Sequence, residues 1–158
     1  MDALIRTKNG ELTLEQIADA LPGTSEIMAQ VGRRYARAYY AAHGGNWELA
    51  AYCLREIRSR QRMLAVIRPK YARQLAEFDR EALAPLLATV EARDWEEFER
   101  AFAQGIRRAN HYHSQTGKSY IRWKLPERIT DDLDFGPATT DSDKSTARAA
   151  IPTRGERS

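Results

Sequence analysis

The chain is poor in the residues that build disulfides and zinc sites. Its 158 residues include one cysteine and three histidines, so no intramolecular disulfide can form and a reducing compartment is favoured. No Cys-x-x-Cys, His-Glu-x-x-His or Glu-x-x-His motif occurs, which argues against a dedicated zinc or di-iron enzyme. Cys53 lies within an apolar helical pattern and is expected to be a small buried residue rather than a nucleophile.

Long apolar runs are also missing. No window approaches the roughly 18 apolar residues of a membrane-spanning helix, and the first six residues lack the apolar core of a secretory signal. We therefore expect a cytoplasmic protein that does not enter a membrane. Gly-x-Ser-x-Gly and Gly-rich phosphate-loop motifs are absent as well, so no common hydrolase or nucleotide-binding signature is present.

The net charge of +3 is unevenly distributed. Residues 46–73 contain seven Lys or Arg and two Asp or Glu, whereas residues 77–100 contain eight acidic and three basic residues. If these segments pack as neighbouring helices, the two excesses neutralise each other. We then expect Arg55, Arg58 or Arg62 to pair with carboxylates of residues 77–99, and we expect no nucleic-acid partner. The alternative is an arginine-lined face that meets an anionic partner.

Apolar residues recur at spacings of three and four along most of the chain, which is typical of amphipathic helices. The pattern predicts helices over about 24–43 and 47–67, a helix that starts at about 95 and ends at Gly117, and a weaker helical stretch over 70–78 followed by a helix over 79–92. Thr13, Asn46 and Asp94 have the residue types of helix N-caps. The predicted core comprises Trp47, Leu54, Ile57, Trp95, Phe98, Phe102 and Ile106.

These patterns predict an all-α fold, namely an antiparallel four-helix bundle over residues 24–118. Residues 1–23 are expected to form a lead-in with one short N-terminal helix. Residues 119–136 are too apolar to remain free in water, so we expect an extended C-terminal arm packed on the bundle. The composition of residues 137–158 predicts a disordered tail.

Two of the three histidines, His111 and His113, lie at the end of the last predicted helix. A helical register turns their side chains about 160° apart and places His113 on the buried face. A neutral imidazole there could ligate haem iron or another metal, with His111 as a weaker candidate metal ligand. The alternative is a partly buried histidine that is hydrogen-bonded to a tyrosine or a carboxylate.

Residues 45–52, 54–57 and 113–117 resemble the class II cytochrome c-like (cytochrome c′-type) four-helix bundle family. The resemblance covers roughly residues 25–121. It implies a four-helix bundle and places His113 at the position of the axial haem ligand. Ala109 and Tyr112 stand where that family has its two haem-attaching cysteines, so covalent haem c is excluded.

Together, pattern and resemblance indicate a small non-enzymatic binding protein without catalytic residues. Its ligand would be haem held non-covalently or another small molecule, in a site between the helix that starts at Trp47 and the helix that ends at His113, closed over by the arm. The residues expected at this site are Trp47, Tyr112, His113, Tyr120, Arg122 and Trp123. One alternative is an accessory subunit that docks on a partner enzyme or forms a homodimer, with no small ligand. Another is an enzyme with His113 as general base and Tyr112 or Tyr120 as proton donor.

Overall fold

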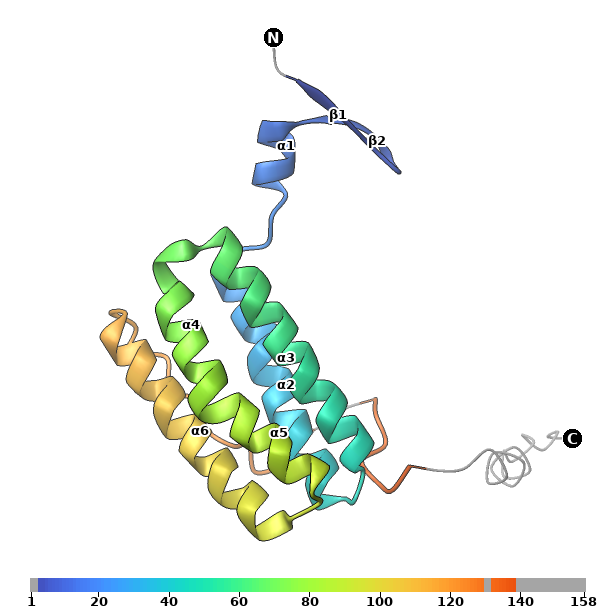
Figure 1. Ribbon diagram of the computed structural model, residues 1–158, viewed down its shortest axis with the longest axis vertical. Helices are drawn as coiled ribbons and strands as arrows, with labels where there is room; N and C mark the ends of the chain where they lie inside the picture. Colours follow the sequence, from blue (N-terminus) through green and yellow to red (C-terminus); the bar gives the residue numbers. More distant parts are fainter. Residues whose placement is uncertain (1–2, 130–131, 139–158) are drawn as a thin grey trace, which may run out of the picture.

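The computed structural model describes residues 3–129 and 132–138, and this part of the chain is mostly helical, as the sequence predicts. Figure 1 shows the long helices side by side, with a small sheet beyond one end of them. The helices are α1 (Leu14–Asp19), α2 (Thr24–His43), α3 (Trp47–Ile67), α4 (Ala72–Phe78), α5 (Ala84–Glu91) and α6 (Trp95–Gln115).

A β-hairpin precedes the first helix, where the sequence pattern predicts only a lead-in. Strands β1 (Leu4–Thr7) and β2 (Gly10–Thr13) pair antiparallel. Gly10 has φ +137°, a conformation that side-chain-bearing residues rarely adopt. Asn9-Gly10 is a common hairpin-turn sequence, so the hairpin has a local signal although it was not predicted. The N-cap predicted at Thr13 is confirmed and forms a capping box, because Thr13 Oγ1 accepts from Gln16 N and Thr13 N donates to Gln16 Oε1.

The predicted bounds of α2, α3 and α6 are close to the observed ones. Asn46 caps α3, where its side-chain oxygen accepts from Leu49 N at 3.0 Å. Asp94 caps α6 in the same way and accepts from Glu97 N at 3.1 Å. These side chains satisfy amide groups that a helix start leaves without partners.

The segment between α3 and α6 is more continuous than the sequence pattern predicts. After a 3₁₀ turn at Pro69–Tyr71, helix α4 runs through a π-helical turn, Asp79–Leu83, directly into α5. Within this turn Ala84 N donates to Asp79 O, five residues back. Pro85 lacks an N–H group and follows at the start of α5, so the widened turn accommodates proline without ending the helical run.

The core lies between the long helices. Leu54, Ile57, Phe98 and Phe102 are buried, as predicted. Three other predicted core residues are only partly buried and pack on the edge of the core; these are Trp47, Trp95 and Ile106.

Two of the predicted ion pairs between basic and acidic helices are present. Arg58 donates to both carboxylate oxygens of Asp79, at 2.6 and 3.0 Å. Arg55 pairs with Glu91 at 3.3 Å. The two charge excesses therefore meet where α3 faces the α4–α5 run.

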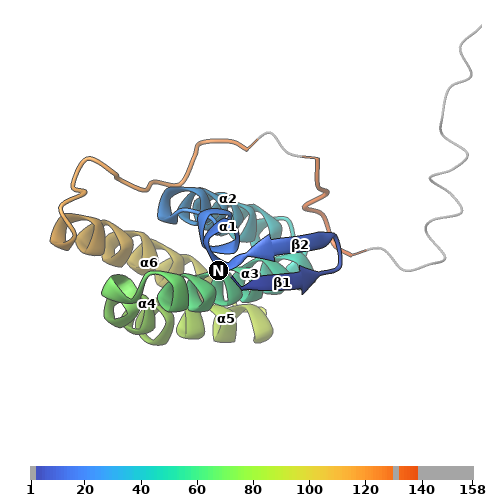
Figure 2. The ribbon, with the colours of Figure 1, turned by 90° about the horizontal axis from the view of Figure 1, so that it is seen from above.

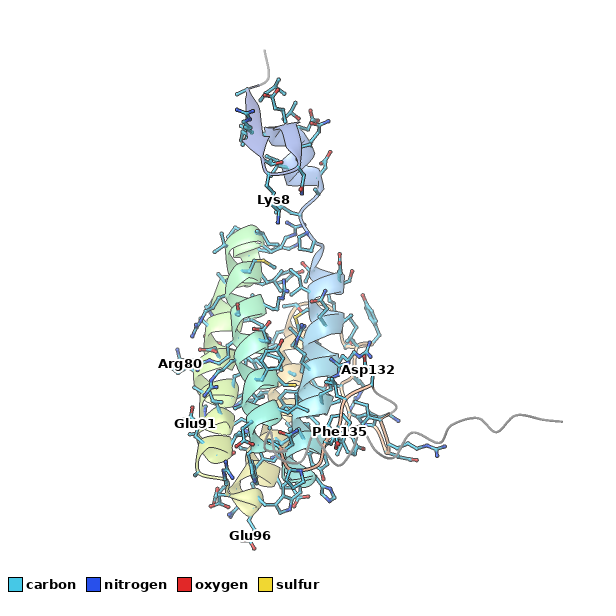
Figure 3. All side chains as sticks on the ribbon, turned by 90° about the vertical axis from the view of Figure 1, so that its right-hand side faces the viewer. Lys8, Arg80, Glu91, Glu96, Asp132 and Phe135 are labelled. Atoms are coloured by element: carbon cyan, nitrogen blue, oxygen red, sulfur yellow. The ribbon has the colours of Figure 1, made fainter. Side chains whose placement is uncertain are left out.

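The described residues after α6, 116–129 and 132–138, have no regular secondary structure and pass from the end of α6 over α2, as Figure 2 shows from above. Trp123, Leu125 and Phe135 pack against the core from outside. Near the end of this segment, Asp134 O accepts a hydrogen bond from Asn46 Nδ2 at 3.1 Å. Figure 3 shows Asp132 and Phe135 beside the long helices. Lys8 lies beyond the end of the helices at which α2 begins (Figure 3). The predicted disordered tail falls mostly on residues 139–158, outside the described residues.

Candidate ligand-binding pocket

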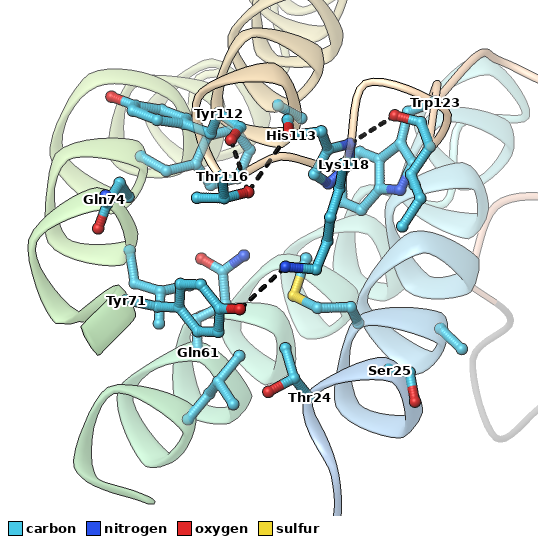
Figure 4. Close-up of a pocket in the computed structure, with 17 residues that line it drawn as sticks. Thr24, Ser25, Gln61, Tyr71, Gln74, Tyr112, His113, Thr116, Lys118 and Trp123 are labelled. Carbon is cyan, nitrogen blue, oxygen red and sulfur yellow. Dashed lines mark hydrogen bonds between the residues drawn. The ribbon is translucent and has the colours of Figure 1, made fainter. Parts of the chain in front are cut away.

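A pocket of about 600 Å³ lies at the end of the long helices where α2 begins and α3 and α6 end. Figure 4 shows it between α2, α3, α4, α6 and the first residues of the arm. Its wall is mostly apolar and includes Met28, Leu64, Leu75, Phe78 and Ala109. A cavity of this size falls within the range of about 300–1,000 Å³ that is typical of small-molecule sites.

Buried aromatic side chains of α6 pack the core at one end of the long helices but not at the end that holds the pocket. At the end away from the pocket, Trp95 stacks on Phe98 at 5.7 Å and Tyr39 lies 5.0 Å from Phe102. Towards the pocket, the buried positions of α6 are Gly105 and Ala109. Tyr35 packs against Gly105, whereas Ala109 lines the pocket and its methyl group fills little of it.

His113 is half-buried and lines the pocket. Its Nδ1 lies 2.9 Å from the carbonyl oxygen of Ile121. A carbonyl oxygen can only accept, so Nδ1 is the donor of this hydrogen bond. Trp123 stands edge-on to the imidazole, with ring centroids 5.8 Å apart. A neutral ring in this orientation would have its lone pair on Nε2 and could accept a hydrogen bond or ligate a metal there.

The arm is fastened to α6 close to His113. Asn110 Nδ2 donates to Trp123 O at 3.0 Å, and Trp123 N donates to Asn110 Oδ1 at 2.7 Å. This two-point contact holds Trp123 at the wall of the pocket.

Lys118 brings a positive charge to the pocket. Its Nζ donates to Tyr71 Oη at 2.9 Å and lies 5.0 Å from the centre of the Tyr71 ring. The hydrogen bond from Lys118 is the main cause that lowers the pKa of the Tyr71 phenol below its ordinary value. Among the described residues, those that line the pocket include no Asp or Glu.

Two amide side chains at the pocket have buried oxygens without a hydrogen-bond partner in the described part of the chain. They are Gln61 Oε1 on α3 and Gln74 Oε1 on α4. Gln61 is only 3% exposed and is a buried polar residue among apolar neighbours. A buried acceptor left unpaired costs about 1–3 kcal/mol, so a polar group of a guest molecule or of water is needed beside it.

Tyr112 contributes its ring to the pocket, while its hydroxyl group points to a carboxylate. Tyr112 Oη donates to Glu77 Oε2 at 3.2 Å. Burial and this carboxylate raise the pKa of Tyr112. The hydroxyl is therefore engaged and remains protonated at neutral pH.

The structure brings together three of the residues that the sequence predicts at the site, namely Tyr112, His113 and Trp123. Trp47 is far from them because it packs on Phe98, which precedes His113 by 15 residues, or about 22 Å of helix. Tyr120 is 79% exposed and does not line the pocket.

Arg122 and His111 also lie apart from His113. Arg122 lines a smaller pocket of about 410 Å³ between α2, α6 and the arm. His111 is exposed, as the helical register requires. In residues 3–129 and 132–138 no group of three or more His, Cys, Asp or Glu side chains could hold a metal ion.

Several polar residues of the pocket were not predicted from the sequence, and Gln61, Gln74, Tyr71 and Lys118 are among them. Gln61 could have been found, since it lies four residues after Ile57 and three before Leu64, as a polar residue on an apolar helix face. Tyr71 and Lys118 carry no such signal, because they meet only through the fold.

Comparisons with known protein families, with curated protein sequences and with solved structures found no match. Within the part of the chain that the structure describes, no helix combines the length and apolar character needed to cross a membrane.

Proposed function

We propose that the chain is a non-enzymatic binding protein, built as an antiparallel four-helix bundle, that holds a small ligand in the pocket beside His113. The observation that carries the proposal is the buried, unpartnered Gln61 Oε1 in the wall of a mostly apolar pocket of about 600 Å³, all within the described residues. A site that is apolar overall with a few convergent polar groups is typical of small-molecule binding. The arm, fastened by Asn110, closes one side of the site.

Haem bound non-covalently is one ligand that this proposal includes. The resemblance to the class II cytochrome c-like family suggests it, and a neutral His113 would offer at Nε2 the lone pair that an axial ligand needs. Lys118 is the basic side chain in the pocket wall that could pair with a propionate. A haem held here would be bound by His113 and Lys118 and would supply one-electron chemistry.

The test of pocket binding uses Nile red, a neutral dye whose fluorescence rises in apolar surroundings. We expect saturable binding by the full chain and its loss in Ala109→Phe and Met28→Trp, two substitutions that fill the pocket from different helices. Circular dichroism and thermal unfolding show whether each variant folds. Absent or unsaturable binding by the folded wild-type protein would contradict the proposal, as would unchanged affinity in both folded variants.

Haem binding is tested separately with haemin. A sharp Soret band that is lost in His113→Ala and kept in His111→Ala would identify haem as the ligand, because His111 is exposed on the same helix. Nile red binding without a His113-dependent Soret band would keep the pocket as a binding site and remove haem as its ligand.

A second candidate function is that of an interaction subunit. The hairpin and α1 carry apolar side chains in water, with Leu4 62% and Leu14 61% exposed. Light scattering tests the homodimer form of this function. A dimer that becomes a monomer in Leu14→Ser would support it, and a wild-type monomer at all concentrations would contradict it.

A further inference from the structure

We infer that the ligand of this pocket is an organic anion with an apolar body, whose anionic group pairs with Lys118. The inference rests on the proposed binding function and names the class of its ligand. A carboxylate and a phosphate ester share the chemistry that Lys118 would recognise.

The sign of the charge in the pocket is the first argument. Lys118 lines the pocket and no Asp or Glu of the described chain does, so the charge that faces a ligand is positive. An anion gains from this charge, whereas a cation is repelled by it.

The bonding of Lys118 is the second argument. Many basic side chains of this protein find a carboxylate, as Arg58 does with Asp79 and Arg93 with Glu48. Lys118, in contrast, forms no ion pair within residues 3–129 and 132–138, and its described hydrogen-bond partner is the phenol of Tyr71. An ammonium group has three N–H donors, so two of them remain for a ligand.

The position of Lys118 is fixed before a ligand arrives. Gly117 has φ +74°, and Lys118 N donates to His113 O at 2.7 Å to close the end of α6. The side chain then lies over the Tyr71 ring. Figure 4 shows Nζ reaching across the pocket mouth to Tyr71. Because the ammonium is already held in place, pairing with an anion costs little further ordering.

The wall of the pocket indicates the chemical character of the ligand apart from its anionic group. An inorganic anion would leave the apolar surface of Leu64, Leu75 and Phe78 uncovered, so an apolar body of drug-like size fits better. A pure hydrocarbon, in turn, would leave Gln61 Oε1 unpaired. The pocket therefore suits an amphipathic molecule.

The experiment is displacement of Nile red from the full chain at pH 7.5 by three ligands with the same ten-carbon body: decanoate, decyl phosphate and decan-1-ol. We expect both anions to displace the dye at concentrations about tenfold lower than the alcohol, the factor expected for one charge-assisted bond. Decanoate acting at lower concentration than decyl phosphate indicates a carboxylate ligand, and the reverse indicates a phosphate ester. Either order supports the inference.

Lys118→Met is the decisive variant, and Lys124→Met is its matched control. Both lysines lie in the segment after α6, but Lys124 lines the smaller pocket. Lys118→Met should abolish the advantage of the anions over decan-1-ol, with displacement by each ligand compared at that variant's own affinity for Nile red, and Lys124→Met should keep this advantage.

Two results would have different meanings. If wild-type protein does not bind Nile red, the proposed function itself fails. If it binds the dye but the alcohol and the anions compete equally, or if Lys118→Met keeps the advantage of the anions, the pocket stands as a binding site and the inference of an anionic ligand is overturned.

Discussion

At the scale of single residues, Gly105 makes room for a contact that ties α2 to α6. Tyr35 stacks on Phe102 with ring centroids 4.3 Å apart, and its hydroxyl donates to Phe102 O at 2.8 Å. A Cβ atom at Gly105 would clash with Tyr35 Oη. Burial raises the pKa of Tyr35, so the hydroxyl stays protonated and keeps donating.

Gly105→Ala should therefore destabilise the protein although alanine favours a helix by about 1 kcal/mol. The added methyl group displaces the buried Tyr35 hydroxyl and breaks its hydrogen bond, which costs about 1–3 kcal/mol, so the net loss in the free energy of unfolding should be up to about 2 kcal/mol. Urea denaturation measures it. The same substitution in a Tyr35→Phe background should cost less, because the clashing oxygen is absent. Stabilisation by Gly105→Ala alone would show that Tyr35 does not occupy this position.

As the pH is raised, Tyr71 should ionise before Tyr35, which is buried, and before Tyr39 and Tyr112, which are partly buried. Lys118 lowers the pKa of Tyr71, whereas burial raises the pKa of Tyr35, Tyr39 and Tyr112. A lowered pKa means that the phenolate form appears at a lower pH than in the unfolded chain. In an ultraviolet titration, Tyr71→Phe should remove the earliest step and Lys118→Met should move it to higher pH. An earliest step that persists in Tyr71→Phe would argue against the Lys118–Tyr71 contact.

At the scale of the elements, three helices end in the same way. After α2, α5 and α6 the chain adopts a left-handed conformation at Gly45 (φ +84°), Arg93 (φ +53°) and Gly117 (φ +74°). In each case the next residue donates its N–H to a carbonyl oxygen five residues back, as Asn46 does to Ala41 O. This is the Schellman arrangement, in which glycine is the favoured residue. Arg93 is the exception, and it carries backbone strain there.

Arg93→Gly and Gly117→Ala should change stability in opposite directions. Removal of the left-handed side chain at Arg93 should raise the free energy of unfolding by about 0.5–1 kcal/mol, after the loss of its exposed pair with Glu48, which contributes about 0–1 kcal/mol. Gly117→Ala introduces the same strain and should lower it by about 1 kcal/mol. Thermal and urea unfolding measure both. Equal signs for the two variants would contradict the shared helix ending.

The sequence determines the elements to different degrees. Helix starts at Asn46 and Asp94 could be predicted because capping is local chemistry between a side chain and the next turn. The π-helical turn at Asp79–Leu83 could not, since it coincides with a contact between Asp79 and Arg58, 21 residues earlier. The hairpin could have been predicted from Asn9-Gly10, but its strands are only four residues long.

The candidate site was predictable where it depends on one helix. Tyr112 and His113 follow from the register of α6, and the apolar arm brings Trp123 back over it. Gln61 and Lys118 approach the same pocket from α3 and from the turn after α6. Gln61 and Lys118 lie at the same pocket because of how the helices pack, and a local sequence pattern does not predict helix packing.

At the scale of the whole molecule, the chain divides into a part with a core and a part without one. No side chain of residues 3–23 is buried, whereas each of the long helices α2, α3 and α6 contributes several buried residues. Figure 1 shows the hairpin and α1 beyond one end of the long helices. An isolated two-stranded hairpin is only marginally stable in water, so this segment contributes little to the stability of the rest.

Deletion of residues 1–21 should therefore leave the helical part intact. Pro22 and Gly23 remain, so Ile27 N keeps its bond to Gly23 O, and none of residues 3–21 lines the pocket. Because little apolar surface is lost, we expect the free energy of unfolding to change by less than about 1 kcal/mol and the affinity for Nile red to stay the same. Phe98→Ala, which empties a fully buried position, serves as the positive control and should cost about 3–5 kcal/mol in the same urea titration. A deletion as damaging as Phe98→Ala would show that the hairpin and α1 pack on the helices in solution, and the exposed Leu4 and Leu14 would then no longer support an interaction surface.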